Sequence, residues 1–192
     1  MAHSVHLTLT GHHGNPARFH QRIDATLARG PDGALNIAYM IHGLNLDLRV
    51  PTPHAPAPAA ALWQTTCCEL FIGTAGQAGY REFNFSPSGQ WAACNFLDYR
   101  QRGPDMPACP APTIRTQREE NLLEVDVLLP ESALPGRVNG GGDLRLALSV
   151  VLEANDGKLG YWALAHPPGR PDFHHPAGFV LSLQPAGFRP AS

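Results

Sequence analysis

Aromatic, acidic and amide side chains alternate around one turn of the chain, and this pattern is the one most suggestive of chemistry. Tyr80, Glu82 and Asn84 lie two residues apart before the turn sequence Ser-Pro-Ser-Gly at 86–89, and Trp91 follows it. Residues two apart in a β-strand point to the same face of a sheet. A face that carries rings beside carboxylate and amide groups can stack on a flat polar ligand and hydrogen-bond to it.

Alternation on both sides of that turn predicts a β-hairpin whose register depends on the length of its loop. A two-residue loop of Pro87 and Ser88 places Asn84 opposite Trp91, so that both lie on one face. On the same face Glu82 pairs with Ala93, and Tyr80 pairs with Asn95. The other face, which we expect to be the core side, carries Arg81, Phe83, Phe85, Ala92 and Cys94.

Sugars fit such a face, because they offer hydroxyl groups and apolar C–H faces to one site. Glu69 lies in the strand before the hairpin, so strand pairing could bring it beside Glu82. Trp63 and Trp162 could wall the site if their segments converge. The alternative is an ordinary solvent-facing side of an antiparallel sheet, which is also half polar. The sequence leaves both interpretations open.

Catalysis is a second possibility for the same residues. Glu69 and Glu82 could form the pair of carboxyl groups that glycoside hydrolysis requires. The chain has no phosphate-binding P-loop, no glycine fingerprint for dinucleotides and no Gly-x-Ser-x-Gly nucleophile motif. An enzyme is therefore the less favoured interpretation.

The segment 166–175 is rich in histidine, and Asp172, His174 and His175 could ligate a metal there, with His166 six residues upstream of Asp172. An enzyme could therefore also work from this loop. No regular spacing fixes a coordination geometry there, so contacts to a polar ligand or a structural role are favoured. We expect a colourless protein with no cofactor and no stoichiometric metal.

Composition narrows the class of protein. The chain has 192 residues, 43% hydrophobic and 16% charged, with a formal net charge of -2. This balance predicts a globular protein with no strong attraction to nucleic acid or to an anionic membrane. No apolar run reaches the length of a membrane span, and the first residues lack a secretory signal pattern, so we expect a cytoplasmic protein. The four cysteines show no metal-binding spacing and are expected to be reduced thiols.

Short alternating runs predict about ten strands, which are clearest at 5–9, 35–41, 123–129 and 144–152. The segment 15–29 fits either a helix or the first strand of a hairpin, and the clear strand at 35–41 favours the hairpin. With little helix and no internal repeat, we expect an all-β, antiparallel, immunoglobulin-like β-sandwich. It would form a single domain over residues 1–192, and a barrel is the alternative architecture.

Several motifs resemble those of the bacterial DOMON-like proteins related to carbohydrate-binding module family 9. They are Leu62-Trp63, the run Cys68–Ile72, the run Tyr80–Trp91, Tyr99-Arg100, the run Tyr161–Pro167 and the run Pro171–His174. The resemblance covers about residues 5–183 and implies a β-sandwich with a ligand-binding role. Across that superfamily the ligands are sugars or haem. The stacking tryptophans of the family 9 modules have no residue-by-residue match here.

Three functions follow as hypotheses. The favoured one is a non-catalytic domain that binds a carbohydrate or a similar polar ring-shaped ligand, with protein partners unspecified. The others are an enzyme and a haem-binding domain, for which Met40 and His42 share one side of a strand. The predicted ligand-binding residues are Trp63, Glu69, Tyr80, Glu82, Asn84, Trp91, Trp162, His166, Asp172 and His174.

Overall fold

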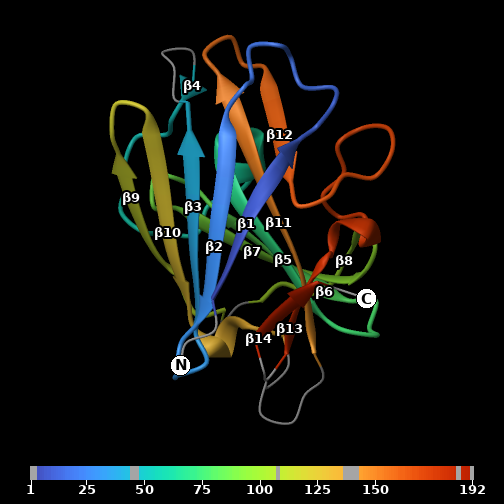
Figure 1. Cartoon of the computed structure of the whole chain (residues 1–192). Coiled ribbons are helices and arrows are strands. Elements are labelled where there is room, and N and C mark those ends of the chain that lie inside the picture. The colour runs from blue at the N-terminus through green and yellow to red at the C-terminus, as the bar shows by residue number, and fades with distance from the viewer. Residues whose placement is uncertain (1–3, 44–47, 107–108, 136–142, 185–186, 191–192) are drawn as a thin grey trace.

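The computed structural model describes residues 4–43, 48–106, 109–135, 143–184 and 187–190. In these residues it has fourteen strands and three short 3-10 helices, η1 (Leu62–Gln64), η2 (Glu131–Ala133) and η3 (Pro176–Gly178), but no α-helix (Figure 1). No helix of the described part is long and apolar enough to cross a membrane. The all-β antiparallel fold predicted from the alternating runs is confirmed.

The strands form two antiparallel sheets. Sheet A contains β1 (Ser4–Gly11), β2 (Arg22–Arg29), β3 (Leu35–His42), β10 (Leu122–Leu129) and β9 (Thr113–Arg118), in that order. Sheet B contains β8 (Gln101–Arg102), β7 (Trp91–Asp98), β6 (Tyr80–Phe85), β5 (Cys67–Thr74), β11 (Leu144–Ala154) and β12 (Leu159–Ala163). The short strands β4 (Leu48–Arg49) and β13 (Leu181–Gln184) also pair with β11, and β14 (Gly187–Pro190) pairs with β13.

Strand β1 belongs to both sheets. Most of it pairs with β2, whereas its last two residues, Thr10 and Gly11, pair with β12 of sheet B. The two layers therefore join along one side, where β1 and β12 are neighbours, and cross at an angle in Figure 1. A twisted sheet that folds over in this way buries one face of each half against the other.

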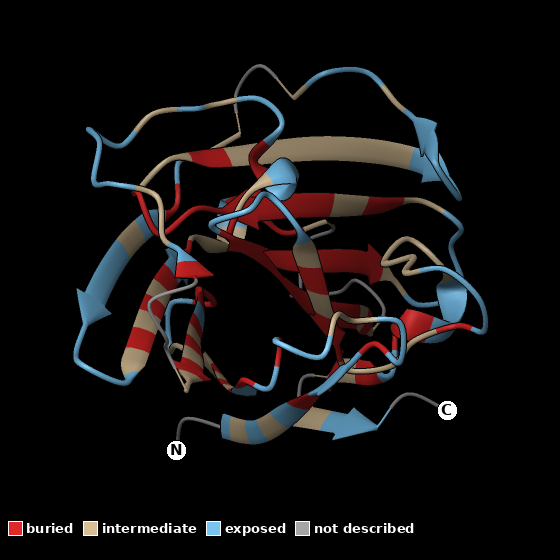
Figure 2. Cartoon of the chain, turned by 90° about the horizontal axis from the view of Figure 1, so that it is seen from above, coloured by how far each residue is buried: buried red, intermediate tan, exposed pale blue. Residues whose placement is uncertain are grey.

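The hydrophobic core lies between the two sheets, where buried residues meet in Figure 2. Sheet A contributes alternate residues, such as Ile23 and Leu27 of β2 and Ile37 of β3, and sheet B contributes Leu70 and Phe83. Because side chains alternate along a strand, the residues between these core positions point to the outer faces of the sandwich. The outer face of sheet B is the one that carries the acidic and amide residues singled out in the sequence.

The segment 22–42 forms the β2–β3 hairpin, so the hairpin interpretation is confirmed and the helix alternative is wrong. Gly33 has a φ of 80° in its turn, a conformation that glycine adopts without strain. Strand β9 was not among the expected strands, because five of its six residues are exposed and polar residues dominate it. Such a strand at a sheet edge carries little periodicity for sequence analysis to detect.

The predicted register of the β6–β7 hairpin is wrong by one residue. Trp91 pairs with Phe85 rather than with Asn84, and Asn84 pairs with Ala92. The loop contains three residues instead of two: Ser86 and Gln90 close it through a 2.9 Å backbone hydrogen bond, and Gly89 has a φ of 92°. A three-residue loop that ends in a left-handed glycine is a common hairpin connection.

This shift exchanges the two faces of β7, because side chains alternate with a period of two. Trp91 lies with Phe83 and Phe85 on the core side and is only 8% exposed. Glu82 pairs with Cys94 instead of Ala93, and Tyr80 pairs with Phe96 instead of Asn95. Cys94 and Phe96, not Trp91, therefore share a face with Glu82 and Asn84.

Candidate functional site

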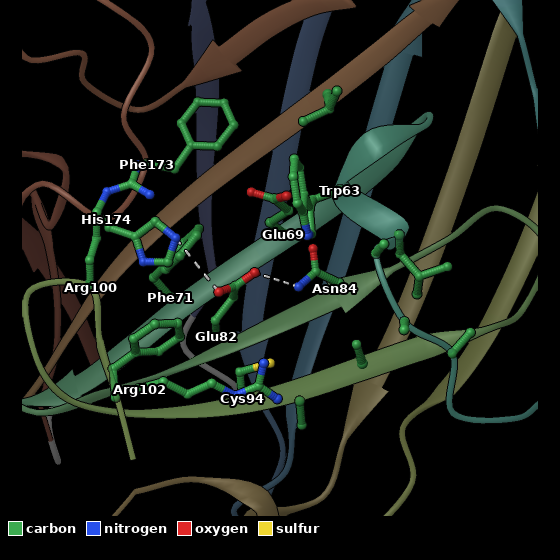
Figure 3. Close-up of a pocket in the computed structure, with 18 of the residues that line it drawn as sticks. Trp63, Glu69, Phe71, Glu82, Asn84, Cys94, Arg100, Arg102, Phe173 and His174 are labelled. Atoms are coloured by element: carbon green, nitrogen blue, oxygen red, sulfur yellow. Dashed lines mark hydrogen bonds and ion pairs between the residues drawn. The ribbon is translucent and has the colours of Figure 1, made fainter. Parts of the chain in front are cut away.

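A pocket of about 990 Å³ opens on the outer face of sheet B. Strands β5, β6, β7 and β11 form its floor, the segment 58–63 forms one wall, and the segment 170–174 forms another (Figure 3). The first wall is held beside β7 by backbone hydrogen bonds that Ala57 and Ala59 make with Trp91. The volume is typical of a pocket that holds a small ligand.

Two carboxyl groups and an amide make the polar part of the floor. Glu69 on β5 and Asn84 on β6 are directly opposite each other in the sheet, and Glu82 lies two residues before Asn84. Asn84 donates from Nδ2 to Glu82 Oε1 at 2.6 Å, and Ser149 Oγ donates to Glu69 Oε2 at 2.8 Å. Figure 3 shows Glu82 between Asn84 and His174.

Burial changes the protonation of both acids. Glu69 is only 2% exposed, and this burial, together with the nearby charge of Glu82, raises its pKa to about 8 despite the hydrogen bond from Ser149. Burial also raises the pKa of Glu82, although the Asn84 amide and the guanidinium groups of Arg102 and Arg100 oppose the rise. Glu69 is therefore mostly a neutral carboxylic acid at pH 7 and can donate a hydrogen bond as well as accept one.

His174 connects the wall of the pocket to Glu82. Burial is the main reason that its pKa falls to about 4, and the positive charge of Arg100 adds to the effect, so the imidazole is neutral near pH 7. Tyr80 Oη lies 2.9 Å from His174 Nδ1 and also accepts the backbone N–H of Arg100. Since the phenol has one hydrogen, we assign it as the donor to Nδ1, which leaves the proton of His174 on Nε2.

This tautomer points an N–H toward Glu82. The Nε2 atom of His174 lies 3.8 Å from Glu82 Oε2, longer than a hydrogen bond, and a neutral imidazole forms no ion pair. The contact is therefore neither a hydrogen bond nor a salt bridge.

The turn between β7 and β8 braces the C-terminal wall. Arg100 Nη2 donates to Asp172 Oδ1 at 2.7 Å, and the Tyr99 hydroxyl donates to Asp172 Oδ2. Burial opposes the charge on Asp172, but these hydrogen bonds outweigh it and lower the net pKa of the carboxyl. Arg100 has a φ of 53°, a left-handed conformation that costs energy for a non-glycine residue. Its backbone N–H donates to Tyr80 Oη at 3.2 Å, so both its backbone and its side chain have partners at this edge of the pocket.

Aromatic rings supply the apolar walls. Phe71 lies two residues from Glu69 on β5 and meets the edge of His174 with ring centroids 5.1 Å apart. Phe96 stacks on Tyr80 at 4.9 Å with an interplanar angle of 6°. Trp63 on η1 is 53% exposed beside the polar floor. Ala61, the residue just before η1, has a left-handed φ of 55°. The pocket thus combines a polar, hydrogen-bonding floor with flat apolar surfaces.

The structure brings five of the ten predicted residues to the pocket: Trp63, Glu69, Glu82, Asn84 and His174. Tyr80 and Asp172 do not line it but hold lining residues, Tyr80 through His174 and Asp172 through Arg100.

Three predicted residues lie elsewhere. The register shift places Trp91 on the core side. Trp162 is also on the core side, where its indole Nε1 donates to Gln21 O at 3.2 Å, so it cannot wall the pocket. His166 does not line the pocket either: its Nε2 contacts Thr10 O at 2.8 Å on β1. These three corrections share one cause, because the face of a side chain depends on registers and segment paths that the sequence does not state.

Sequence reasoning missed several lining residues, namely Phe71, Cys94, Phe96, Arg100, Arg102, Tyr161, Arg170 and Phe173. Phe71 could have been found, because it lies two residues from Glu69 in one strand. Phe96 and Cys94 required the correct hairpin register. Nothing in the sequence around Arg102 indicates a site.

Neither the metal-site nor the haem-binding alternative receives geometric support from its candidate residues. Within the described residues, no group of three or more His, Cys, Asp or Glu side chains is arranged to hold a metal. The backbone N–H of His174 donates to the carboxylate Oδ1 of Asp172 at 3.2 Å, so the imidazole itself does not take part in this contact. Met40 and His42 lie on the outer face of sheet A, where His42 Nε2 is 3.4 Å from Asp24 Oδ2, and neither residue lines the pocket.

Comparison with known proteins identifies relatives in fold only. No described protein family matches the sequence, and no curated protein matches it. A solved structure of a protein provisionally assigned to carbohydrate binding, from Bacteroides uniformis, aligns with a TM-score of 0.61 and 15% identity over 91% of this chain and 84% of that one.

Two structures of a family 9 carbohydrate-binding module from Caldicellulosiruptor kristjanssonii, in complex with glucose and with cellotriose, each align with a TM-score of 0.49. Their identities are 10% and 11%, over 78% and 84% of this chain and 70% and 74% of the modules. The likeness to the Bacteroides protein establishes that this chain shares its fold.

Proposed function

We propose that this chain is a non-catalytic carbohydrate-binding domain whose ligand occupies the pocket on sheet B. One observation carries the proposal: the buried polar groups of Glu69, Glu82 and Asn84 lie on the floor of a pocket with aromatic walls. A sugar ring matches this arrangement, since its hydroxyls meet the polar floor while its C–H faces meet the rings. The fold shared with a protein provisionally assigned to carbohydrate binding agrees with this ligand class.

We infer also that the chain is a DOMON-like protein. Parts of the motifs that resemble that group converge on this pocket, although they are far apart in the sequence. Leu62 and Trp63, Glu82 and Asn84, and His174 all line it. A ligand site explains why motifs from three separate segments have specific residue types.

The chemistry of the floor sets the expected affinity. Each neutral hydrogen bond or ring contact contributes about 1 kcal/mol net, since the sugar exchanges it for water. A few such contacts, in a pocket that is already formed, give dissociation constants on the order of micromolar to millimolar.

Isothermal titration calorimetry with a panel of monosaccharides and oligosaccharides tests the proposal, preceded by a thermal-shift screen. We expect at least one saccharide to raise the melting temperature. Glu82→Gln and Asn84→Ala should each weaken its binding about tenfold, because they remove or replace polar groups that reach the ligand.

The matched control is Glu124→Gln, a half-buried acid on the outer face of sheet A. It should bind like the parent, and circular dichroism should show that all three variants fold. If a confirmed saccharide binds both floor variants as tightly as the parent, its site is not this pocket.

Glycoside hydrolysis is the second candidate, favoured by one observation. Glu69 remains protonated near pH 7 beside a second carboxyl group, as the general acid of a glycosidase must. Release of nitrophenol from a panel of chromogenic glycosides measures this activity directly. Turnover that Glu69→Gln abolishes would show that the domain is catalytic, whereas we expect no turnover above buffer.

A further inference from the structure

Three guanidinium groups from separate places in the chain line the pocket. Arg100 lies in the β7–β8 turn, Arg102 on β8 and Arg170 in the segment after β12. The whole chain carries 14 basic and 16 acidic residues, so acids slightly outnumber bases overall, whereas bases outnumber acids in the lining of this pocket. The acids that line the same pocket are Glu69 and Glu82.

Only one of these arginines is firmly neutralised. Arg100 pairs with Asp172 at 2.7 Å. Arg102 reaches Asp105 at 3.4 Å, but the two side chains are 64% and 88% exposed, and such a surface pair contributes little. Arg170 forms no ion pair with any residue that the structure describes.

The floor is less negative than its two acids suggest. Ser149 donates to the buried carboxyl of Glu69, whose pKa of about 8 leaves it mostly uncharged at pH 7. Arg102 pairs in register with Phe96, a lining residue, and its positive charge acts on Glu82. The pocket therefore has a polar floor for hydroxyl groups, a weakly paired positive charge at Arg102 on its β8 side and, at Arg170 on its C-terminal side, a positive charge without an ion pair among the described residues.

We infer that the ligand is a saccharide whose ring carries an acidic group, a carboxylate as in a uronic acid or a phosphate ester, which Arg102 and Arg170 bind. The inference rests on the proposed function, because Glu82 and Asn84 bind the hydroxyl groups of the same ring. A guanidinium presents parallel N–H donors that match both carboxylate and phosphate oxygens, and such charge-assisted bonds are stronger than neutral ones.

Calorimetry at pH 7 with matched ligand pairs tests the inference. The probes are glucuronate against glucose, galacturonate against galactose, and glucose 6-phosphate as the phosphate arm. We expect an acidic member to bind about tenfold or more tightly than its neutral parent, and to lose affinity as salt is added, because ions screen an exposed charge pair.

Variants assign that preference to the arginines. Arg102→Gln and Arg170→Gln should each reduce the ratio of acidic-ligand affinity to neutral-sugar affinity about fivefold to tenfold, because each removes a charge-assisted contact that only the acidic ligand makes. Arg102→Lys keeps the charge and should restore part of it. Arg118→Gln, which removes an exposed positive charge on β9 of sheet A, is the matched control and should change nothing.

The outcomes separate the two proposals. Preference for a uronate, or for the phosphate ester, that depends on Arg102 and Arg170 supports the inference and identifies the acidic group. If neutral sugars bind as tightly as acidic ones and the arginine variants do not matter, the carbohydrate proposal stands and this inference fails. If no saccharide of either kind binds, the proposed function fails and the inference fails with it.

Discussion

Replacing Glu69 by Gln should remove much of the loss of stability that the protein suffers as pH rises from about 5 to 7. The carboxyl has a pKa of about 8 in the folded state, against 4.5 for an exposed glutamate, chiefly because it is buried. The native state then keeps a proton that the unfolded chain releases. The free energy of unfolding falls wherever the native state binds more protons, so stability is lost through the window from about 4.5 to about 8.

The magnitude follows from the size of the shift. Each unit of pKa corresponds to about 1.4 kcal/mol, so the full cost of a folded-state value near 8 is about 5 kcal/mol above that pH. Between about pH 5 and pH 7 the parent should lose about 2 to 3 kcal/mol relative to Glu69→Gln. This is a large fraction of the total stability of a typical domain, about 5 to 15 kcal/mol. The amide of Gln has no proton to lose and can still accept the hydrogen bond from Ser149.

Urea denaturation at several pH values, for parent and variant side by side, gives the required difference. Glu82 titrates in both proteins, so most of its contribution cancels in the comparison. Ser149→Ala is a further control: it removes a hydrogen bond that lowers the pKa of Glu69, so stability should go on falling to higher pH than in the parent. Parallel curves for parent and Glu69→Gln would mean that Glu69 is ionised in the folded protein, and the description of a neutral floor would be wrong.

Three further substitutions have definite expected outcomes. Trp91→Ala should lower the free energy of unfolding in urea by about 3 to 5 kcal/mol, because Trp91 is a buried core-side residue; a loss below about 1 kcal/mol would contradict its placement. Tyr80→Phe should cost about 1 to 2 kcal/mol, since it leaves His174 Nδ1 and the Arg100 N–H without their partner, and it should move the nitrogen NMR signals of His174; unchanged signals would contradict the assigned tautomer. Ala61→Gly should stabilise the fold by about 0.5 to 1 kcal/mol in the same denaturation assay, because glycine adopts a φ of 55° without the strain that alanine bears; a loss of stability would show that no strain is held there.

Alternation in the sequence was sufficient to predict the fold class and to bring together three residues of the pocket floor. Glu69, Glu82 and Asn84 were placed together correctly because β5 and β6 are neighbours in both sequence and space. A period-two pattern shows which residues of one strand share a face. For two strands that are neighbours, the pattern and their pairing are then sufficient to predict which side chains lie together.

The predicted register of the β6–β7 hairpin was wrong because of one glycine in the turn sequence. Gly89 accepts a left-handed conformation and its N–H donates to Ser86 O at 2.9 Å, which extends the loop to three residues. Two-residue and three-residue loops are both common, and choosing between them moves Trp91 from one face to the other. One residue of loop length thus decided whether a tryptophan was predicted in the site or in the core.

For the C-terminal side of the pocket, the sequence indicated His174 and Asp172 as candidates but not the residues that they contact. His174 meets Tyr80 across 94 residues, and Asp172 meets Arg100 across 72. No local periodicity links such partners, because their contact depends on the path of the loop after β12. Arg170, which also lies after β12, was missed for the same reason.

The pairing of β5 with β11 has a consequence for how the protein folds. Glu69 and Ser149 are hydrogen-bonded on the floor of the pocket although 80 residues separate them in the chain. Contacts between distant residues form slowly, because the entropy of closing a long loop must be overcome before the contacts can compensate for it. A chain emerging from the ribosome cannot complete the floor until β11 has been synthesised. Ligand binding at this pocket therefore requires β11 to have paired with β5, and we expect it to appear late during refolding.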